Sequence, residues 1–115
     1  MRMGGSIPRI IEFDNLDVAD VPVCSEPKCF TQVYHARLEF CLLNANGTVC
    51  VTLETSIDGS KWIPHNECSM FLLDREDTGI KIGTLDGLFY RICLCEDSAT
   101  ATEGILQTRM LLKDH

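Results

Sequence analysis

The residues most able to do chemistry are the cysteines, of which the chain has seven. An odd number leaves at least one thiol that is free, bridged to another chain or bound to a metal. Three interpretations stay open for the set as a whole. The thiols act as small apolar residues in the core, they form disulfides within or between chains, or they bind a metal.

One pair of cysteines has a spacing that predicts a disulfide. If residues 33–43 and 48–56 form a hairpin with the four-residue loop 44–47, Cys41 lies directly opposite Cys50. Facing Cβ atoms in such a ladder approach to about 4.5–5.5 Å, which brings two thiols within reach of a bridge. A two-residue loop would instead set Cys50 against a leucine. Cys41 and Cys50 are therefore the candidate disulfide.

The spacing of the other thiols does not favour a metal site. Structural zinc sites usually have two ligand pairs, each with two to four residues between the ligands. Here His65-x-x-Cys68 is a mixed pair, and Cys93-x-Cys95 has a single intervening residue. Cys93 and Cys95 share one face of their strand with Arg91. We expect no metal ligands in this chain.

No other pattern predicts catalysis or a cofactor. Of the three histidines, His35 lies on the polar face of a strand, His65 follows a proline in a loop, and His115 is terminal. The glycines sit singly at turns, so the chain has no phosphate-binding loop. The acidic residues of 74–77 lack the spacing of a calcium loop and predict a solvated turn. We expect no catalytic residues, no cofactor and no enzymatic activity.

Charge and hydropathy exclude several kinds of partner. The net charge is -7, with 17 acidic and 10 basic residues, which argues against nucleic acid and against an anionic membrane surface. No apolar run approaches the ~20 residues of a membrane-spanning helix. The N-terminal residues lack the apolar segment of a secretory signal, so we expect either synthesis in the cytosol or a leader that has been removed. Deployment outside the cell would reconcile that expectation with the high cysteine content.

Period-two alternation of apolar and polar residues predicts the elements that position these side chains. It is clearest in 33–43 and 48–56, which flank an Asn46-Gly47 turn, and it is followed by an Asp58-Gly59 turn. Asn-Gly and Asp-Gly between alternating runs are strong hairpin signals. Further strands are expected at 67–73, 79–85, 88–95 and 104–113. The residues expected on the core face are Leu38, Phe40, Leu42, Val49, Val51, Leu53, Tyr90, Ile92 and Leu94.

Many short strands at ~8–12-residue spacing are typical of an all-β sandwich or barrel. We therefore predict an all-β fold, a single antiparallel β-sandwich that is jelly-roll-like, with an extended N-terminal arm. The arm comprises residues 1–13 and the sandwich domain residues 14–115.

The predicted arm is unusually apolar for a terminal segment. Its candidate assembly residues are Ile7, Ile10, Ile11 and Phe13. Burying each is worth ~1.5–3 kcal/mol, and a groove or an exposed sheet edge of a neighbouring subunit would provide that burial. The alternative is that the arm packs on its own domain. We expect the first arrangement, in which the arm contributes to contacts between chains.

The segment Val51 to Trp62, VTLETSIDGSKW, resembles a pattern in small β-sandwich proteins of tailed phages. In those proteins a strand runs into a Ser-x-Asp-Gly-x-x-Trp turn, and a later strand carries an aromatic-Arg pair like Tyr90-Arg91. They look like capsid decoration or head-fibre subunits. The same turn is found in carbohydrate-binding and discoidin-like sandwiches, and a high cysteine content is typical of disulfide-linked extracellular fibres.

This resemblance implies a non-enzymatic structural protein of a virus particle. Such a subunit would bind copies of itself, in a small closed oligomer such as a trimer, and would bind a major capsid protein or another assembly protein. It would be made in the host cytoplasm and reside in the virion. The alternatives are a carbohydrate-binding module, in which Trp62 would stack on sugar, and an extracellular fibre subunit. Packing is the favoured role for this tryptophan, the only one in the chain.

Overall fold

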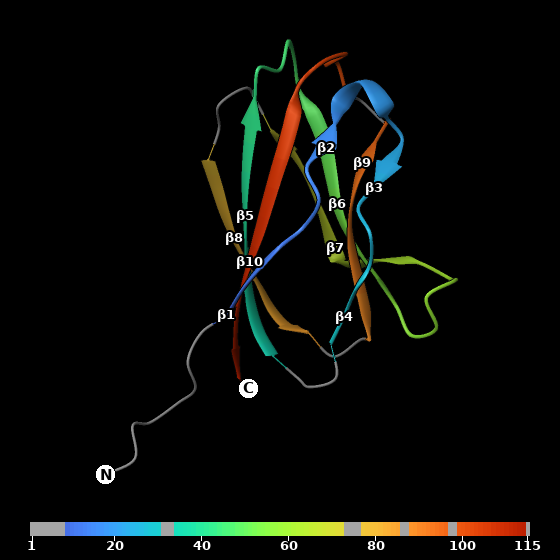
Figure 1. The fold of residues 1–115 in the computed structure, drawn as a ribbon, viewed down its shortest axis with the longest axis vertical. Coiled ribbons are helices and arrows are strands. Elements are labelled where there is room, and N and C mark those ends of the chain that lie inside the picture. Colours follow the sequence, from blue (N-terminus) through green and yellow to red (C-terminus); the bar gives the residue numbers. More distant parts are fainter. Residues whose placement is uncertain (1–8, 31–33, 73–76, 86–87, 97–98, 115) are drawn as a thin grey trace.

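The computed structural model describes residues 9–30, 34–72, 77–85, 88–96 and 99–114. Two antiparallel sheets pack face to face (Figure 1). Their elements are β1 (Arg9–Glu12), β2 (Leu16–Asp17), the 3-10 helix η1 (Val18–Asp20), β3 (Val23–Cys24), β4 (Lys28–Cys29), β5 (Tyr34–Leu43), β6 (Val49–Ser56), β7 (Ile63–Leu72), β8 (Asp77–Leu85), β9 (Phe89–Cys95) and β10 (Ile105–Asp114). Within the described ranges, no helix is long and apolar enough to cross a bilayer.

The strand order is that of a jelly roll. The first sheet runs β1-β10-β5-β8, with β2 also paired to β10, and the second runs β3-β9-β6-β7, with β4 also paired to β9. The short strands β1 and β2 thus follow one another along β10, as β3 and β4 do along β9. The β6–β7 hairpin also stays within one sheet. The remaining connections between consecutive strands cross from one sheet to the other. The predicted all-β, jelly-roll-like antiparallel sandwich is confirmed.

The core lies between the two inner faces and follows the predicted alternation. All nine residues expected on the core face are buried. Residues of β2, η1, β8 and β10 complete the core; they include Leu16, Val18, Leu85, Leu106, Met110 and Leu112. The alternation was sufficient to predict the inward positions because successive side chains of a strand point to opposite faces, whatever the partner strand.

The hairpin predicted around Asn46-Gly47 is wrong. Strands β5 and β6 belong to different sheets, and the segment between them is a crossover. Asn46 is bonded to the neighbouring β9–β10 crossover: its Nδ2 donates to Thr102 Oγ1 at 2.7 Å, and its Oδ1 accepts from the backbone nitrogens of Thr102 and Glu103 at 2.8 and 3.2 Å. The Asn-Gly pair therefore joins two crossovers at one end of the sandwich (Figure 1).

The predicted pairing of Cys41 with Cys50, on which the candidate disulfide depended, is wrong for the same reason. In the ladders, Cys41 lies opposite Gln107 on β10 and Asp77 on β8. Cys50 lies in the other sheet, opposite Cys95 on β9 and Phe71 on β7. The two cysteines therefore do not face each other across a hairpin.

The described part of the predicted arm belongs to the sandwich. Strand β1 pairs with β10 at the edge of the first sheet, and the Phe13 nitrogen donates to the Thr108 carbonyl at 3.0 Å. Phe13 is buried in the core, Ile11 packs against it, and Ile10 is exposed. The expected boundary after residue 13 is thus wrong for residues 9–13, because the sandwich itself provides their burial. Ile7 lies outside the described residues.

The crossover contact predicts a strict requirement for glycine at position 47. A Cβ there would lie 2.5 Å from Thr100 Oγ1 and 3.0 Å from the Ala101 nitrogen. We expect Gly47→Ala to lower the free energy of unfolding by about 1–3 kcal/mol, the usual cost of overpacking. Denaturant titration measures this loss, with Glu103→Ala, which changes an exposed side chain of the β9–β10 crossover, as the control. A loss for Gly47→Ala as small as that of the control would contradict the packing of the two crossovers.

Candidate functional site

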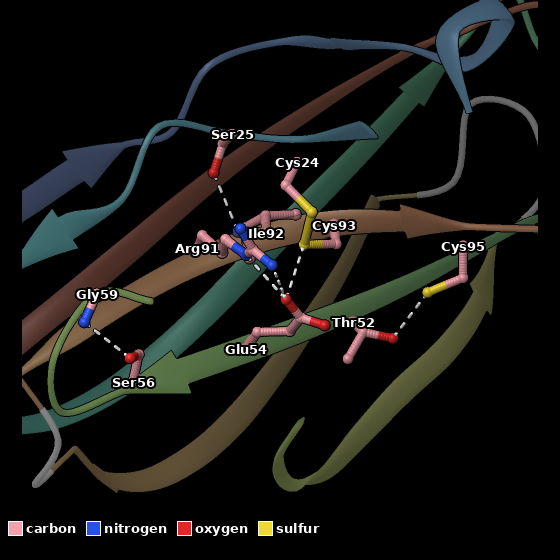
Figure 2. A network of polar contacts seen from close by, with 10 residues as sticks. All are labelled: Cys24, Ser25, Thr52, Glu54, Ser56, Gly59, Arg91, Ile92, Cys93 and Cys95. Atoms are coloured by element: carbon pink, nitrogen blue, oxygen red, sulfur yellow. Dashed lines mark hydrogen bonds and ion pairs between the residues drawn. A yellow bond between two sulfur atoms is a disulfide. The ribbon is translucent and has the colours of Figure 1, made fainter. Parts of the chain in front are cut away.

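The outer face of the second sheet concentrates the reactive and charged side chains. Strands β6 and β9 pair antiparallel, with Glu54 opposite Arg91 and Cys50 opposite Cys95. Because alternate residues share a face, Glu54, Arg91 and the cysteines of β9 all point away from the core. Figure 2 shows this cluster, with Glu54 between Arg91 and Cys93.

Glu54 and Arg91 form the charged centre of this face. Arg91 Nε donates to Glu54 Oε1 at 2.8 Å, and Nη2 lies 2.7 Å from the same oxygen. The guanidinium carbon of Arg91 also lies 4.2 Å from the ring centroid of Trp62, a cation–π contact. The pair is about three-quarters buried, so solvent screens it less than a fully exposed pair. Arg91 is therefore fixed from two sides.

A disulfide joins this centre to the edge of the sheet. Cys24 on β3 is bonded to Cys93 on β9, across a sequence separation of 69. Cys93 Sγ lies 3.3 Å from Glu54 Oε1. The sequence predicted that Cys93 lies on the face of Arg91, and both residues contact Glu54. It did not predict Cys24 as the partner, because β3 is only two residues long and shows no alternation.

Ser25 holds the neighbouring edge segment against β9. Its buried hydroxyl accepts from the Ile92 nitrogen at 3.0 Å, and its own nitrogen donates to the Ile92 carbonyl at 2.8 Å. These bonds lie between β3 and β4, where regular pairing is interrupted (Figure 2). The disulfide and Ser25 together fix Cys24 relative to Glu54.

Among the described side chains, His65 and the cysteines of β9 lie on opposite faces of the second sheet. His65 is buried and lies edge-on to Tyr90, with ring centroids 5.6 Å apart, at the inner face of the second sheet. Cys93 is on the outer face, and Cys95 Sγ shares a hydrogen bond of 3.2 Å with Thr52 Oγ1. The side chain of Cys68 lies outside the described residues.

The other candidate residues are scattered. His35 is exposed on β5 of the first sheet, and Cys29 is exposed on β4. Asp74, Glu76 and His115 lie outside the described residues. His35 and the outer-face cluster belong to different sheets.

The Asp58-Gly59 turn is confirmed, and it closes the β6–β7 hairpin. Asp58 Oδ1 accepts from the backbone nitrogens of Ser60 and Lys61 at 2.9 and 3.0 Å and from the Ser56 hydroxyl at 3.0 Å. Gly59 has a φ of 79°, which favours glycine. The turn places the ring of Trp62 against the guanidinium of Arg91.

These bonds predict an acid-sensitive turn. The backbone hydrogen bond from Ser60, followed by that from Lys61, lowers the pKa of Asp58 from 3.8 to about 2. Because the folded pKa is lower than the unfolded one, the carboxylate stabilises the turn above pH 3.8, and this contribution is lost as the pH falls through 2. We expect a carboxyl midpoint near 2 in an NMR titration, against 3.8 in a peptide of residues 56–62. Equal midpoints in both would contradict the turn geometry.

Exposed apolar side chains surround the same hairpin. Ile57 and Ile63 flank the turn and are 79% and 63% exposed. Leu88 is also exposed and precedes Phe89, which pairs with Ser56. Ile57 follows Ser56 and Leu88 precedes Phe89, so both residues come directly after the same end of the β6–β9 ladder. We call Ile57, Ile63 and Leu88 the apolar end.

Comparison with solved structures shows that the fold of this chain is similar to part of a viral protein chain. No family model matches this chain, and no curated protein matches it. Among solved structures, one similar chain comes from "Structure of infectious bursal disease virus Gx strain", with a TM-score of 0.50 and 8% sequence identity. The match covers 96% of this chain and 34% of that chain, so this chain spans about a third of its length. At this identity, the likeness concerns the fold.

Proposed function

We propose that this chain is a non-enzymatic structural subunit of a virus particle, a capsid decoration subunit that associates with copies of itself and binds a larger assembly. The observation that carries the proposal is the jelly-roll strand order over nearly the whole chain. Jelly rolls of this kind are used in viral capsid domains, and also in lectins and cupins. The similar chain from a virus structure supports the first of these uses.

The apolar end supports self-association. Side chains as exposed as Ile57 and Ile63 gain ~1.5–3 kcal/mol each when a partner buries them. Leu88 is also exposed and lies just beyond the same end of the β6–β9 ladder as Ile57. In a symmetric oligomer, each copy of this chain can bury the same surface against a neighbouring copy.

The edge of the first sheet supplies a further contact. Strand β1 has β10 on one side, and in the described chain no strand pairs with its other side. Ile10 on this strand is exposed. Such an edge can accept a strand of another subunit. Ile10 and this edge are therefore the part of the N-terminal segment that would contribute to contacts between chains.

The alternatives considered from the sequence receive less support. A carbohydrate-binding module would present the ring of Trp62 to a sugar, but Arg91 lies over that ring. A disulfide-linked fibre would need bridges between chains, whereas Cys24 and Cys93 are bonded to each other within the chain.

The direct test of this role is the composition of virus particles. Particles purified from cells that express this chain should contain it at a fixed molar ratio to the major capsid protein, as measured by quantitative mass spectrometry. Washing at high ionic strength distinguishes an integral component from an adsorbed one, and an abundant host protein of similar size serves as the control for adsorption. Absence from washed particles would overturn the proposal.

A further inference from the structure

We propose that Cys24, Cys93 and Glu54 form a binding site for a soft divalent cation such as Zn²⁺ when the disulfide between the two cysteines is reduced. This inference goes beyond the proposed structural role and does not depend on it. The three residues come from three adjacent strands, β3, β9 and β6. One ligand atom of each lies within 4.8 Å of the others.

One of the three ligand separations already fits tetrahedral coordination, and the other two can adjust once the bridge is open. With Zn–S near 2.3 Å and Zn–O near 2.0 Å, a tetrahedral site has sulfur and oxygen ligands about 3.5 Å apart. The observed separation between Cys93 Sγ and Glu54 Oε1 is 3.3 Å. The Cα atoms of Cys24 and Cys93 are 4.1 Å apart on paired strands, so the ladder keeps the two thiols adjacent after the bridge is opened.

The surroundings fit the charge of such a site. Two thiolates and one carboxylate around a divalent ion leave a net charge of about −1. Arg91 Nη2 lies 2.7 Å from Glu54 Oε1. The guanidinium therefore offsets that charge and orients the carboxylate, as partners of metal ligands commonly do. Trp62 in turn holds Arg91. In Figure 2 the carboxylate of Glu54 contacts both the guanidinium of Arg91 and the sulfur of Cys93.

Access from solvent is also present. Cys24 is exposed on the edge strand, Glu54 is about three-quarters buried, and Cys93 is buried beneath them. An ion can therefore reach the site from the side of Cys24. Three protein ligands leave a fourth position for water, an arrangement typical of open zinc sites.

The bridge and the metal exclude each other chemically. A phosphine reductant reacts with the disulfide and one water to give two thiols and a phosphine oxide, so the S–S bond receives two electrons. Binding of the cation then replaces the two thiol protons, which are released to solvent. The same residues thus hold a covalent bond in an oxidising environment and a cation in a reducing one.

The test is a titration of the reduced full-length chain with Co²⁺, which reports thiolate ligands through a charge-transfer absorption band. We expect one tight site whose band is lost, or whose affinity falls at least tenfold, in Cys24→Ser. The matched control is Cys29→Ser, which removes an exposed thiol of the adjacent strand β4 and should leave the band unchanged. Glu54→Gln should weaken binding about tenfold or more while the thiolate band per bound ion is kept.

Two measurements on the unchanged protein complete the test, so the result does not depend on the folding of a variant. Oxidised protein should lack the tight site, and binding to reduced protein should release two protons per ion. Circular dichroism verifies that each variant is folded. Equal binding by Cys24→Ser and the wild-type chain, or by oxidised and reduced protein, would overturn the proposal.

Discussion

Replacing Phe40 with alanine should lower the free energy of unfolding by about 3–5 kcal/mol, the usual cost of deleting a buried phenylalanine. Phe40 is only 2% exposed and lies on β5, in the middle of the first sheet between β10 and β8. Its ring projects into the space between the sheets, where the loss of the side chain leaves a cavity. Chemical denaturation followed by circular dichroism measures the change.

The matched control for Phe40 is Ile10→Ala. Ile10 is 61% exposed on the edge strand β1, so its truncation in a dilute, monomeric sample should change the free energy of unfolding by no more than ~0.5 kcal/mol. A loss below 1 kcal/mol for Phe40→Ala would mean that the register of β5 in the sheet is different.

Removal of the Cys24–Cys93 bridge should have an effect of similar size. A loop closed over a sequence separation of 69 contributes about 4 kcal/mol in the chain-entropy model of disulfide stabilisation. We expect the free energy of unfolding of the double variant Cys24→Ser/Cys93→Ser to be lower than that of the oxidised wild-type chain by about this amount. A chelator in the buffer prevents metal binding from contributing.

Reduction provides the control for the double variant. Reduced wild-type protein and the double variant should unfold at similar denaturant concentrations, since both lack the bridge. Cys29→Ser, which changes an exposed thiol outside the bridge, should match the oxidised wild-type chain. An oxidised wild-type chain no more stable than the double variant would contradict the bridge.

Sequence periodicity predicted the inward residues because alternation depends on the strand alone. Leu38, Phe40 and Leu42 face the core whether β5 pairs with β6 or with β10 and β8. The fold class followed from the number and spacing of such strands. These features are local, and tertiary pairing does not change them.

Pairing between strands could not be predicted in the same way. A crossover between sheets and a hairpin both need a short polar loop, so Asn46-Gly47 was compatible with either. In the observed crossover Asn46 bonds to Thr102, a residue 56 positions away, and no local pattern predicts such a contact. The Asp58-Gly59 turn was interpretable because its bonds lie within residues 56–61.

The candidate site shows the same limit. The alternation of β9 placed Cys93 with Arg91, but Glu54 and Cys24 reach them only through the pairing of β9 with β6 and β3. Likewise, Phe13 looked like part of an exposed arm because its burial depends on contacts with a distant strand, β10. Sequence showed which side chains share a strand face, and the topology decided which strands share a sheet.

The central claim is that this chain is a self-associating structural subunit, and light scattering coupled to size-exclusion chromatography tests it most directly. The claim predicts a molar mass that is a defined multiple of 12.9 kDa at micromolar concentration. It also predicts dissociation when Ile57→Asp and Ile63→Asp place charges on the apolar end, with Lys113→Asp, an exposed position on β10, as the control. A monomer of 12.9 kDa at every concentration up to about 1 mM would contradict the claim.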